Sequence, residues 1–517
     1  MNKTLYILAL TAFVYASCKK DDLGPTRLFR PVGTGELTAD SNTIVASWQK
    51  IAGATNYVIE VSRDTFATID QSLSVDSNAA VVKKLLFNQL YQVQVKAVAA
   101  DTAMNSKWSN LGAVKTLSSI LKMPDIDDIT FNSVRARWAT KGAPVTSLKI
   151  IKNADSSVVA TVTLSATDVT NEFKVIDGLI ADTRYTIYLY SEKDERGYVA
   201  FSTKVPFSGT VIDLTDITGR PGVLADTLPV IPSGSTILLK RGETYNISTT
   251  TSLNKTLIFM SGPDLSTTAQ ARIYFTSNFT FAANSTIDSI EFNDLYLYSD
   301  NYGGRYVFNN TNSANIGKLK FMNSRIEIFR GVVRLQSGTL NMTDFIVDNC
   351  IVDSISNYFV LTVGTTASRV NTVSMTNSTF YKVEGVIASV QTSNSVLISD
   401  CTFNEAPLGN SKNVYVDYNA NVITNGLTIK NSLFGIGKIS AGATTVKDLR
   451  LGTGTVVTLG NNYKTDDHKT ATGNDFPTIN PSIRTSVQLW QDPYNGNFKI
   501  ADQTFPGRTS TGAPRWR

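Results

Sequence analysis

Two acidic residues, Glu327 and Asp353, stand at the same place in consecutive copies of a short repeated phrase. If the copies stack as neighbouring strands, their outward side chains line up about 4.8 Å apart. Carboxylate oxygens are the hard ligands that Ca²⁺ prefers. The pair therefore predicts a calcium site, with Ca²⁺ as the candidate cofactor. The alternative is a pair of solvated charges on an outward face.

Tyrosines are numerous in the same part of the chain, and their rings suit carbohydrate. The flat face of a tyrosine stacks on the apolar C–H face of a sugar, and a flanking guanidinium can bond the hydroxyls. Four tyrosines are predicted to face solvent and to bind a glycan, together with one arginine: Tyr302, Tyr358, Tyr381, Tyr415 and Arg334.

A repeat must position these side chains. An alternating strand is followed by Asn or Asp, a small residue, a variable residue and a large apolar residue; the first positions are Asn293, Asn323, Asn349, Asn377, Asp400 and Asn431. They are separated by 30, 26, 28, 23 and 31 residues. A repeat of this length with strand periodicity is typical of a β-solenoid.

The repeated phrase has a physical explanation. Asn and Asp tolerate the left-handed backbone of a tight turn, and stacked amides can bond one another between coils. These six residues are therefore predicted to form a ladder. The apolar residue three places on is predicted to point inward; these residues are Tyr296, Ile326, Val352, Phe380, Phe403 and Phe434. The next residue would form an outward column: Leu297, Glu327, Asp353, Tyr381 and Asn404.

The segment from Leu228 to Tyr245 resembles the opening of pectin-lyase-like β-helices: a Pro/Gly turn, an inward strand, then a Gly turn followed by tyrosine. The resemblance implies a right-handed parallel β-helix. It also implies a possible lyase chemistry, in which calcium bridges uronate carboxylates and an Arg or Lys removes a proton. Arg330 and Lys382 are the candidates for that catalytic base.

The last residues differ in character from the repeats. The runs from Asp492 to Ile500 and from Gly507 to Trp516 resemble the closing segment of uncharacterised β-helix surface lipoproteins. A solenoid needs its last open edge covered, so a capping role is predicted here.

The part before the solenoid contains two similar segments of short alternating strands. Val45–Trp48 and Val134–Trp138 each end a strand with a tryptophan, and Leu179–Tyr185 places tyrosine at the start of a later strand. This pattern resembles the fibronectin type III sandwich, in which such a tyrosine bonds back to the turn backbone. The resemblance implies two spacer modules.

The first residues are typical of an export signal. Lys3 precedes the apolar run 5–15, and Ala16-Ser17-Cys18 is followed by charged residues. This stretch resembles a bacterial lipoprotein signal, with Cys18 acylated and a location on the outer face of the outer membrane. More than one acyl chain gives stable membrane anchoring.

Composition excludes several classes of function. The net charge of +5 is spread without a Lys/Arg run, so no nucleic-acid partner is expected. The three cysteines provide no disulfide framework, and a single histidine argues against His-based zinc sites and a Ser-His-Asp hydrolase.

Together these patterns predict an all-β chain with the following divisions: signal 1–17, acylated cysteine and linker 18–28, fibronectin type III-like domains 29–118 and 119–207, and parallel β-helix with caps 208–517. The favoured function is capture of a polysaccharide, such as a pectin-like glycan, by a lipid-anchored surface protein beside a SusC/SusD-type importer. The first alternative is a polysaccharide lyase or hydrolase, and the second is an adhesin.

Overall fold

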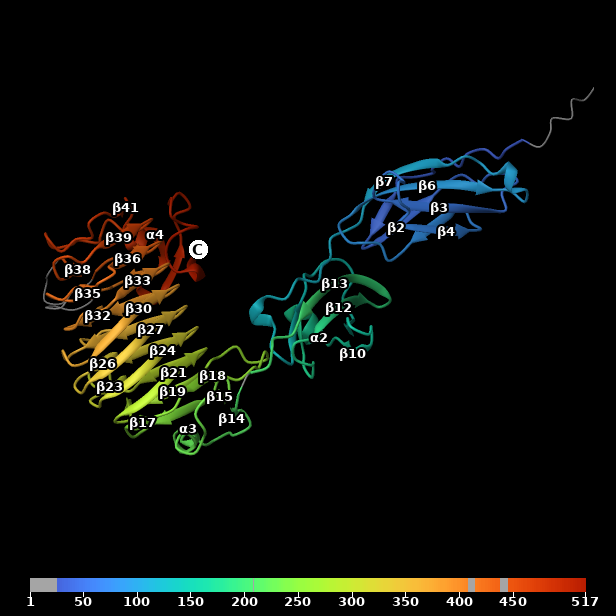
Figure 1. Cartoon of the computed structure of the whole chain (residues 1–517). Helices are drawn as coiled ribbons and strands as arrows, with labels where there is room; N and C mark the ends of the chain where they lie inside the picture. Colours follow the sequence, from blue (N-terminus) through green and yellow to red (C-terminus); the bar gives the residue numbers. More distant parts are fainter. Residues whose placement is uncertain (1–25, 208, 408–413, 438–444) are drawn as a thin grey trace, which may run out of the picture. The chain divides into compact units, whose positions relative to one another are not determined.

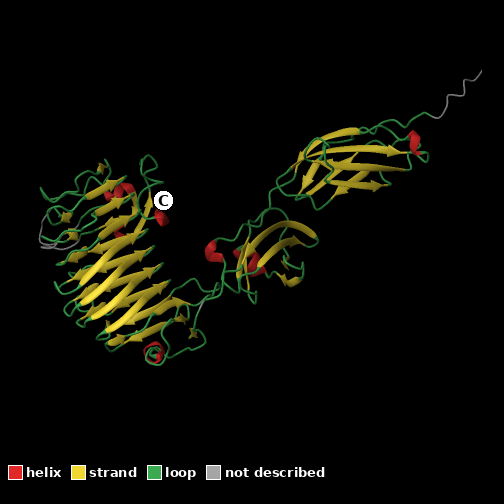
Figure 2. Ribbon diagram, in the orientation of Figure 1, coloured by secondary structure: helices red, strands yellow, loops and turns green. Residues whose placement is uncertain are grey.

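The computed structural model describes residues 26–207, 209–407, 414–437 and 445–517, and these form two compact units, Met1–Pro206 and Phe207–Arg517. The predicted signal and Cys18 lie outside the described residues. Among the described residues, no helix is both long and apolar enough to span a membrane. The fold is nearly all β, as predicted (Figures 1 and 2).

The first sandwich contains two antiparallel sheets, β1-β2-β5 and β4-β3-β6-β7. Its strands are β1 (Thr38–Asp40), β2 (Thr43–Ser47), β3 (Asn56–Ser62), β4 (Gln71–Val75), β5 (Ala79–Val82), β6 (Leu90–Val98) and β7 (Ser109–Lys115), with a 3₁₀ turn at Thr102–Met104. Trp48 is fully buried between the sheets, and the Tyr91 hydroxyl accepts a hydrogen bond from the Leu86 N–H at 3.0 Å.

The second sandwich repeats this plan with sheets β11-β8 and β10-β9-β12-β13. Its elements are β8 (Val134–Arg137), β9 (Ser147–Lys152), β10 (Val158–Thr163), α2 (Ala166–Asn171), β11 (Phe173–Ile176), β12 (Arg184–Ser191) and β13 (Asp194–Ser202), with a 3₁₀ turn at Ile126–Asp128. Trp138 is buried, and the Tyr185 hydroxyl accepts from the Ile180 N–H at 3.0 Å. Both sandwiches are therefore fibronectin type III-like, as predicted.

The second unit is a parallel β-solenoid of about nine coils, built from three sheets. Sheet A contains β14 (Val211–Asp213), β15 (Ser235–Leu239), β18 (Leu257–Ser261), β21 (Ser285–Asn293), β24 (Ala314–Met322), β27 (Leu340–Asp348), β30 (Arg369–Thr376), β33 (Ser395–Ser399), β36 (Leu427–Lys430) and β39 (Val457–Gly460). Consecutive coils differ in length mainly in their turns.

Sheet B contains β16 (Thr244–Ile247), β19 (Ala271–Phe275), β22 (Leu295–Ser299), β25 (Arg325–Phe329), β28 (Ile351–Ile355), β31 (Thr379–Val383), β34 (Thr402–Asn404), β37 (Leu433–Phe434), β40 (Tyr463–Lys464) and β41 (Asn480–Pro481). Sheet C contains β17 (Thr251–Leu253), β20 (Phe279–Phe281), β23 (Tyr306–Asn310), β26 (Gly331–Leu335), β29 (Leu361–Val363), β32 (Gly385–Ser389), β35 (Val414–Asp417) and β38 (Leu449–Arg450).

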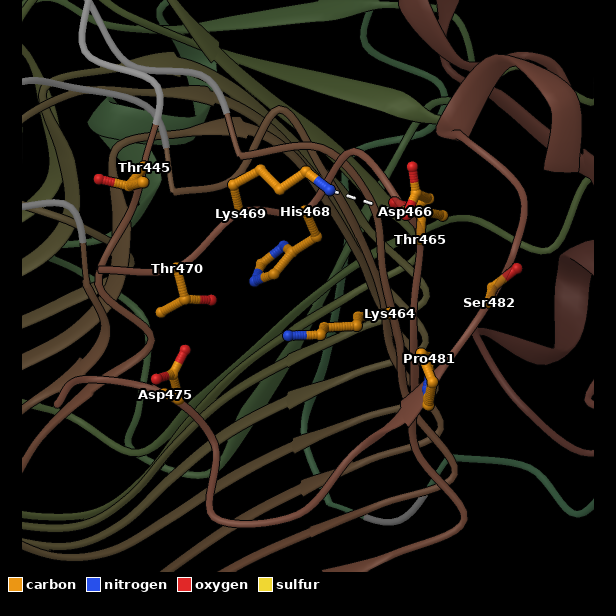
Figure 3. A pocket seen from close by; sticks show the side chains of 10 residues that line it. All are labelled: Thr445, Lys464, Thr465, Asp466, His468, Lys469, Thr470, Asp475, Pro481 and Ser482. Carbon is orange, nitrogen blue, oxygen red and sulfur yellow. Dashed lines mark ion pairs between the residues drawn. The ribbon is translucent and has the colours of Figure 1, made fainter. Parts of the chain in front are cut away.

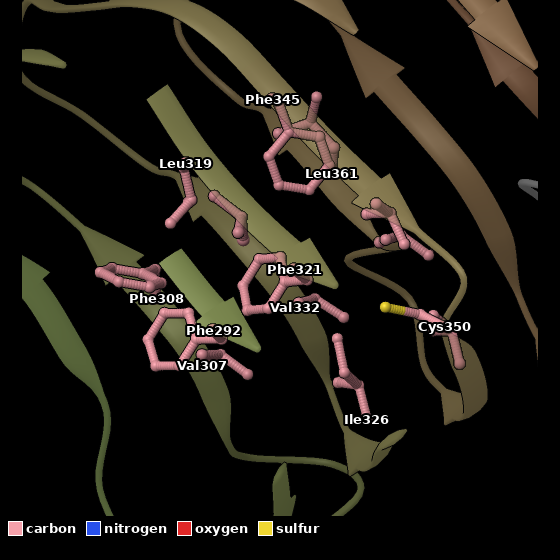
Figure 4. Close-up of a cluster of buried hydrophobic side chains, with 14 of the residues drawn as sticks. Phe292, Val307, Phe308, Leu319, Phe321, Ile326, Val332, Phe345, Cys350 and Leu361 are labelled. Atoms are coloured by element: carbon pink, nitrogen blue, oxygen red, sulfur yellow. The ribbon is translucent and has the colours of Figure 1, made fainter. Parts of the chain in front are cut away.

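Stacked aromatic side chains fill the inside of the solenoid (Figure 4). Phe292 and Phe321 stack at 5.1 Å, and Phe403 and Phe434 at 4.9 Å, which matches the spacing of parallel strands. Helix α3 (Val223–Thr227) contributes Val223 and Leu224 to the same core at its first coils.

The predicted turn ladder lies between sheets A and B. Its residues adopt positive φ and are Asp294, Asn323, Asn349, Asn377, Asp400, Asn431 and Asn461. The Asn349 amide donates to Asn323 at 2.8 Å, and the Asn461 amide donates to Asn431 at 3.1 Å. Asn293 was predicted at this place, but it lies one residue earlier, at the end of β21. Its carbonyl side-chain oxygen still accepts from Asn323 at 2.9 Å.

Because of that one-residue difference, Tyr296 and Leu297 point to the opposite faces of the strand from those predicted, since successive residues of a strand face opposite sides. Leu297, rather than Tyr296, pairs with Ile326 and is fully buried. The prediction of an inward Tyr296 is therefore wrong, and Tyr296 faces outward.

The C-terminal segment lies on the outer face of sheet B. It comprises α4 (Ser486–Leu489), β42 (Trp490–Asp492), a 3₁₀ turn (Pro493–Asn495), β43 (Asn497–Ile500) and a last 3₁₀ turn (Pro514–Trp516). Trp490 and Phe498 pack with Tyr381 and Leu433 of sheet B. The segment predicted to cap the end of the solenoid thus covers the outer face of β31, β34 and β37 instead. It does not cover the outer face of the earlier strands of sheet B.

Candidate functional site

The outer face of sheet B carries one polar and aromatic column through consecutive coils. The strand register aligns Asn246, Tyr274, Tyr298, Glu327, Asp353, Tyr381 and Asn404. Sequence reasoning placed Leu297 in this column, and the structure replaces it with Tyr298 because of the register difference described above. The adjacent outward column contains Arg272, Tyr296 and Arg325.

Three tyrosines of these columns form a tyrosine platform, defined here as Tyr274, Tyr296 and Tyr298. The rings of Tyr274 and Tyr298 stack with centroids 4.9 Å apart, and those of Tyr296 and Tyr298 also stack at 4.9 Å. All three are partly exposed. The rings therefore stack mainly on one another, and the platform presents their partly exposed edges and hydroxyl groups to solvent across β19 and β22.

The carboxylates of Glu327 and Asp353 are neighbours, because β25 and β28 pair them directly. Arg325 lies against both, with its Nε 2.6 Å from Glu327 Oε2 and a terminal nitrogen 3.6 Å from Asp353 Oδ2. The Tyr296 hydroxyl also donates to Glu327. Burial and the nearby negative charge of Glu327 raise the pKa of Asp353, while burial and its bond to Glu327 raise that of Tyr296.

This arrangement does not fit the predicted calcium ion. The guanidinium of Arg325 already bridges the two carboxylates that would bind the ion. Within the described ranges, no group of three or more His, Cys, Asp or Glu side chains could hold a metal. Calcium prefers six to eight oxygen ligands, and a cation paired with both carboxylates competes for the same oxygens.

The two candidate bases lie in different surroundings. Lys382 has its Nζ 3.4 Å from the Tyr494 carbonyl oxygen and 4.0 Å from a Glu405 carboxylate oxygen, so the C-terminal segment holds it. Arg330 lies over the ring of Tyr358, 4.7 Å from its centroid. Both candidate bases are thus already in contact with neighbouring groups of the chain.

Three predicted glycan-binding residues lie where sheet B turns into sheet C: Tyr302 and Tyr358 in the turns and Arg334 in β26. The Arg334 guanidinium lies 3.8 Å from the centroid of Tyr358 and donates to the Tyr306 hydroxyl at 3.3 Å. The Tyr302 hydroxyl donates to Glu384 at 3.1 Å, and burial beside this carboxylate raises the pKa of Tyr302 to about 12. We call this group, with Arg330, the corner cluster.

The other two predicted tyrosines do not face solvent. Tyr381 is 4% exposed, and its hydroxyl donates to the Tyr494 carbonyl beneath the C-terminal segment. Tyr415 is completely buried, and its hydroxyl donates to the Ala406 carbonyl. The expectation that these two rings are open to a sugar is therefore wrong.

A polar pocket of about 460 Å³ lies near the last coils (Figure 3). Lys464 lines it, at the register position that Phe434 occupies one coil earlier. His468 borders it but is buried, with Nδ1 2.8 Å from the Gly435 oxygen and Nε2 2.9 Å from Asp448. This histidine supports the structure of the coil end.

Sequence reasoning missed Tyr274 and Tyr298 as outward binding candidates. Both could have been found by aligning Ala271–Phe275 with Leu295–Ser299, since each five-residue strand places tyrosine at its fourth position. Arg325 was also missed, because it belongs to the variable position of the repeat and its role depends on the register of β25.

The fold and site define a protein with two fibronectin type III-like sandwiches and a parallel β-solenoid. A family model described as "Domain of unknown function (DUF5123)" matches residues 396–516. A two-domain fibronectin type III segment of chicken tenascin is 16% identical, with 34% of this chain and 99% of that chain covered and a TM-score of 0.17. Chicken CNTN1 FN1–FN3 is 12% identical, with 35% and 68% covered and a TM-score of 0.17. No curated protein matches this chain.

Proposed function

We propose that this chain is a polysaccharide-binding surface protein whose solenoid holds a glycan on the tyrosine platform. The observation that supports it is the contact of three outward tyrosine rings, each 4.9 Å from the next. Exposed tyrosine edges contact the apolar C–H groups of sugars, and tyrosine hydroxyls exchange hydrogen bonds with sugar hydroxyls. Arg272 and Arg325 flank Tyr296 in the strand register and supply N–H donors for sugar hydroxyls.

The cellular setting is part of the same proposal. Cys18 would be acylated and would hold the protein in the outer membrane, facing the exterior. The two sandwiches would serve as spacers between the lipid and the solenoid, and a SusC/SusD-type importer would receive the captured glycan. The N-terminal sequence and the domain order support this setting.

Affinity electrophoresis in gels containing a panel of polysaccharides tests the proposal. The variant Tyr274→Ala/Tyr298→Ala should weaken binding of any retarding glycan by about tenfold or more, since a buried side chain contributes about 1.5–3 kcal/mol and 1.4 kcal/mol is a factor of ten. The matched control is Tyr188→Ala/Tyr198→Ala, which removes another pair of contacting tyrosines from the second sandwich, with centroids 5.7 Å apart.

Equal retardation of both double variants and the wild type would show that the platform does not bind the glycan. Absence of retardation by every polysaccharide would reject polysaccharide binding altogether. That second result would favour the adhesin, whose partner is a protein or host surface.

A hydrolase that uses Glu327 and Asp353 is the second candidate function. It is favoured by the direct pairing of Glu327 with Asp353 across β25 and β28 and by the raised pKa of Asp353, because glycoside hydrolysis uses two carboxyl groups of which the acid has a raised pKa. Release of reducing ends from a bound polysaccharide, lost in Asp353→Asn, would establish it. A lyase is less well supported, since Arg325 takes the place of the calcium that its chemistry would use.

A further inference from the structure

The corner cluster brings two guanidinium groups to one tyrosine ring. Arg330 precedes β26, Arg334 lies in β26, and Tyr358 lies in the turn between β28 and β29. The guanidinium carbons are 4.7 Å and 3.8 Å from the centroid of the Tyr358 ring. At 3.8 Å, the Arg334 guanidinium covers one face of the ring, so Tyr358 orients this arginine instead of offering that face to a sugar.

A glycine permits this close approach. A Cβ atom at Gly331 would lie 2.7 Å from the Tyr358 Cβ and 2.8 Å from its carbonyl oxygen, closer than packed atoms tolerate. Gly331 follows Arg330 and is the first residue of β26, the strand that carries Arg334. The turn of one coil can therefore lie directly against the next, which places Tyr358 beside both arginines.

The positive charge of the two arginines is not neutralised within the described part of the chain. No ion pair there includes Arg330 or Arg334, whereas nearby arginines are paired: Arg305 with Asp300, Arg325 with Glu327 and Arg450 with Asp417. The side-chain bonds of the two residues go to neutral groups, Asn357 at 3.2 Å and the Tyr306 hydroxyl at 3.3 Å.

Glu384, the carboxylate that binds Tyr302 of the corner cluster, has hydroxyl groups as its hydrogen-bond partners. Glu384 accepts hydrogen bonds from the Tyr302 hydroxyl at 3.1 Å and the Ser356 hydroxyl at 3.1 Å. The Nε of Arg334 is buried and has no hydrogen-bond partner among the described residues. Two cations against one ring repel each other, and an anion beside them would relieve that repulsion.

We propose that Arg330 and Arg334 bind an anionic substituent of the polysaccharide, so that the protein selects acidic glycans. This inference rests on the proposed polysaccharide binding and adds the charge of the ligand. The planar fork of arginine fits the paired oxygens of a carboxylate or a sulfate. Either a uronic acid or a sulfate ester supplies that chemistry.

Polymers that differ only in charge test the proposal. Dissociation constants of the full chain are measured for polygalacturonate against its fully methyl-esterified form, and for dextran sulfate against dextran. The first pair isolates the carboxylate and the second isolates the sulfate. We expect at least one acidic polymer to bind about tenfold or more tightly than its neutral partner, because a hydrogen bond to a charged group contributes about 1.5–3 kcal/mol. The preference should decrease with added salt.

The test variant is Arg330→Gln/Arg334→Gln, and its matched control is Lys320→Gln/Lys430→Gln. The control removes the same charge from the outward face of sheet A, in strands β24 and β36. We expect the test variant to lose the preference for the acidic polymer and the control to keep it. Arg330→Lys/Arg334→Lys keeps the charge without the planar fork and should retain only part of the preference. The lysine variant also takes the place of the glutamine variant in this test if the glutamine variant does not fold.

Three outcomes overturn the inference, and they differ in what they say of the proposed function. If the wild type binds charged and neutral polymers equally, the inference fails and polysaccharide binding stands. The same holds if the acidic preference survives in both the glutamine and lysine variants. If no polymer binds, while the chain is folded by circular dichroism, polysaccharide binding and the inference fail together.

Discussion

Replacing His468 with alanine removes a partner from a buried carboxylate. Asp448 is completely buried and accepts three hydrogen bonds: from the His468 ring at 2.9 Å, from the Thr470 hydroxyl at 3.0 Å and from the Phe476 N–H at 3.3 Å. The substitution leaves the two weaker neutral donors and a cavity where the ring was. The carboxylate then remains buried without its closest partner.

The expected cost follows from that burial. Leaving a buried acceptor without one of its hydrogen-bond partners destabilises a protein by about 1–3 kcal/mol, because the desolvation penalty remains while the bond is lost. Since 1.4 kcal/mol is a factor of ten, opening of the last coils should become roughly fivefold to a hundredfold more frequent. The effect should be confined to the later half of the solenoid, because each coil is stabilised mainly by its neighbours and the C-terminal segment links these later coils.

Hydrogen exchange of the full chain, read by mass spectrometry in β36, β39 and β40, measures this opening. The matched control is Lys469→Ala, one residue away. Lys469 and Asp466 form an ion pair at 3.7 Å, but their side chains are 59% and 63% exposed, and such surface pairs contribute little. The control should leave exchange in these strands unchanged.

The same substitution in the Asp448→Asn variant tests whether the buried carboxylate causes the effect. In Asp448→Asn the buried carboxylate is absent, so His468→Ala should cost clearly less than in the wild type. An equal cost in both backgrounds, or a change in exchange no larger than that of the lysine control, would refute the reasoning.

Two further predictions concern a carboxylate and a cysteine. The pKa of Asp353 is raised above its ordinary value of 3.8, so the folded chain binds this proton more tightly than the unfolded chain does. The free energy of unfolding therefore falls as pH rises from 3.8 through the folded pKa. Asp353→Asn should therefore raise the unfolding temperature at pH 7 and have little effect below pH 3.8; an equal shift at both pH values, read by calorimetry, would contradict this. Cells grown with an alkyne fatty acid should label the wild type but not Cys18→Ala, and label retained in the variant would place the acylation elsewhere.

Most of the fold could be predicted from local sequence patterns. The tyrosine of Leu179–Tyr185 indicated a sandwich corner because its contact lies only five residues back in the chain, and the structure has that bond. The turn asparagines indicated a solenoid because Asn and Asp favour the left-handed backbone that each coil needs at the same point.

The register was harder to predict where two suitable turn residues are adjacent. Asn293 and Asp294 can both adopt a left-handed turn, and only the pairing of β21 with β24 selects Asp294. A shift by one residue exchanges the faces of a strand. This is why Tyr296 was assigned to the core and Tyr298 was missed.

The remaining differences between the predicted and the observed site come from long-range packing. Tyr381 is covered by residues more than a hundred positions later, at Tyr494 and Phe498, which a repeat pattern does not indicate. Arg325 is likewise placed by strand pairing, and it changes the predicted calcium site into an ion-paired cluster. Tyr415 satisfies its hydroxyl inside the core, so its polar atom did not require solvent.

The C-terminal segment links four coils of the later half of the solenoid. Gly512 donates to Asn431 at 2.9 Å, Ala513 to Thr402 at 2.8 Å, Trp516 to Thr379 at 2.8 Å and Arg515 to Asn349 at 2.6 Å. Opening any of these four coils therefore disturbs a strap shared by all of them. The later half of the solenoid should therefore melt as one cooperative block.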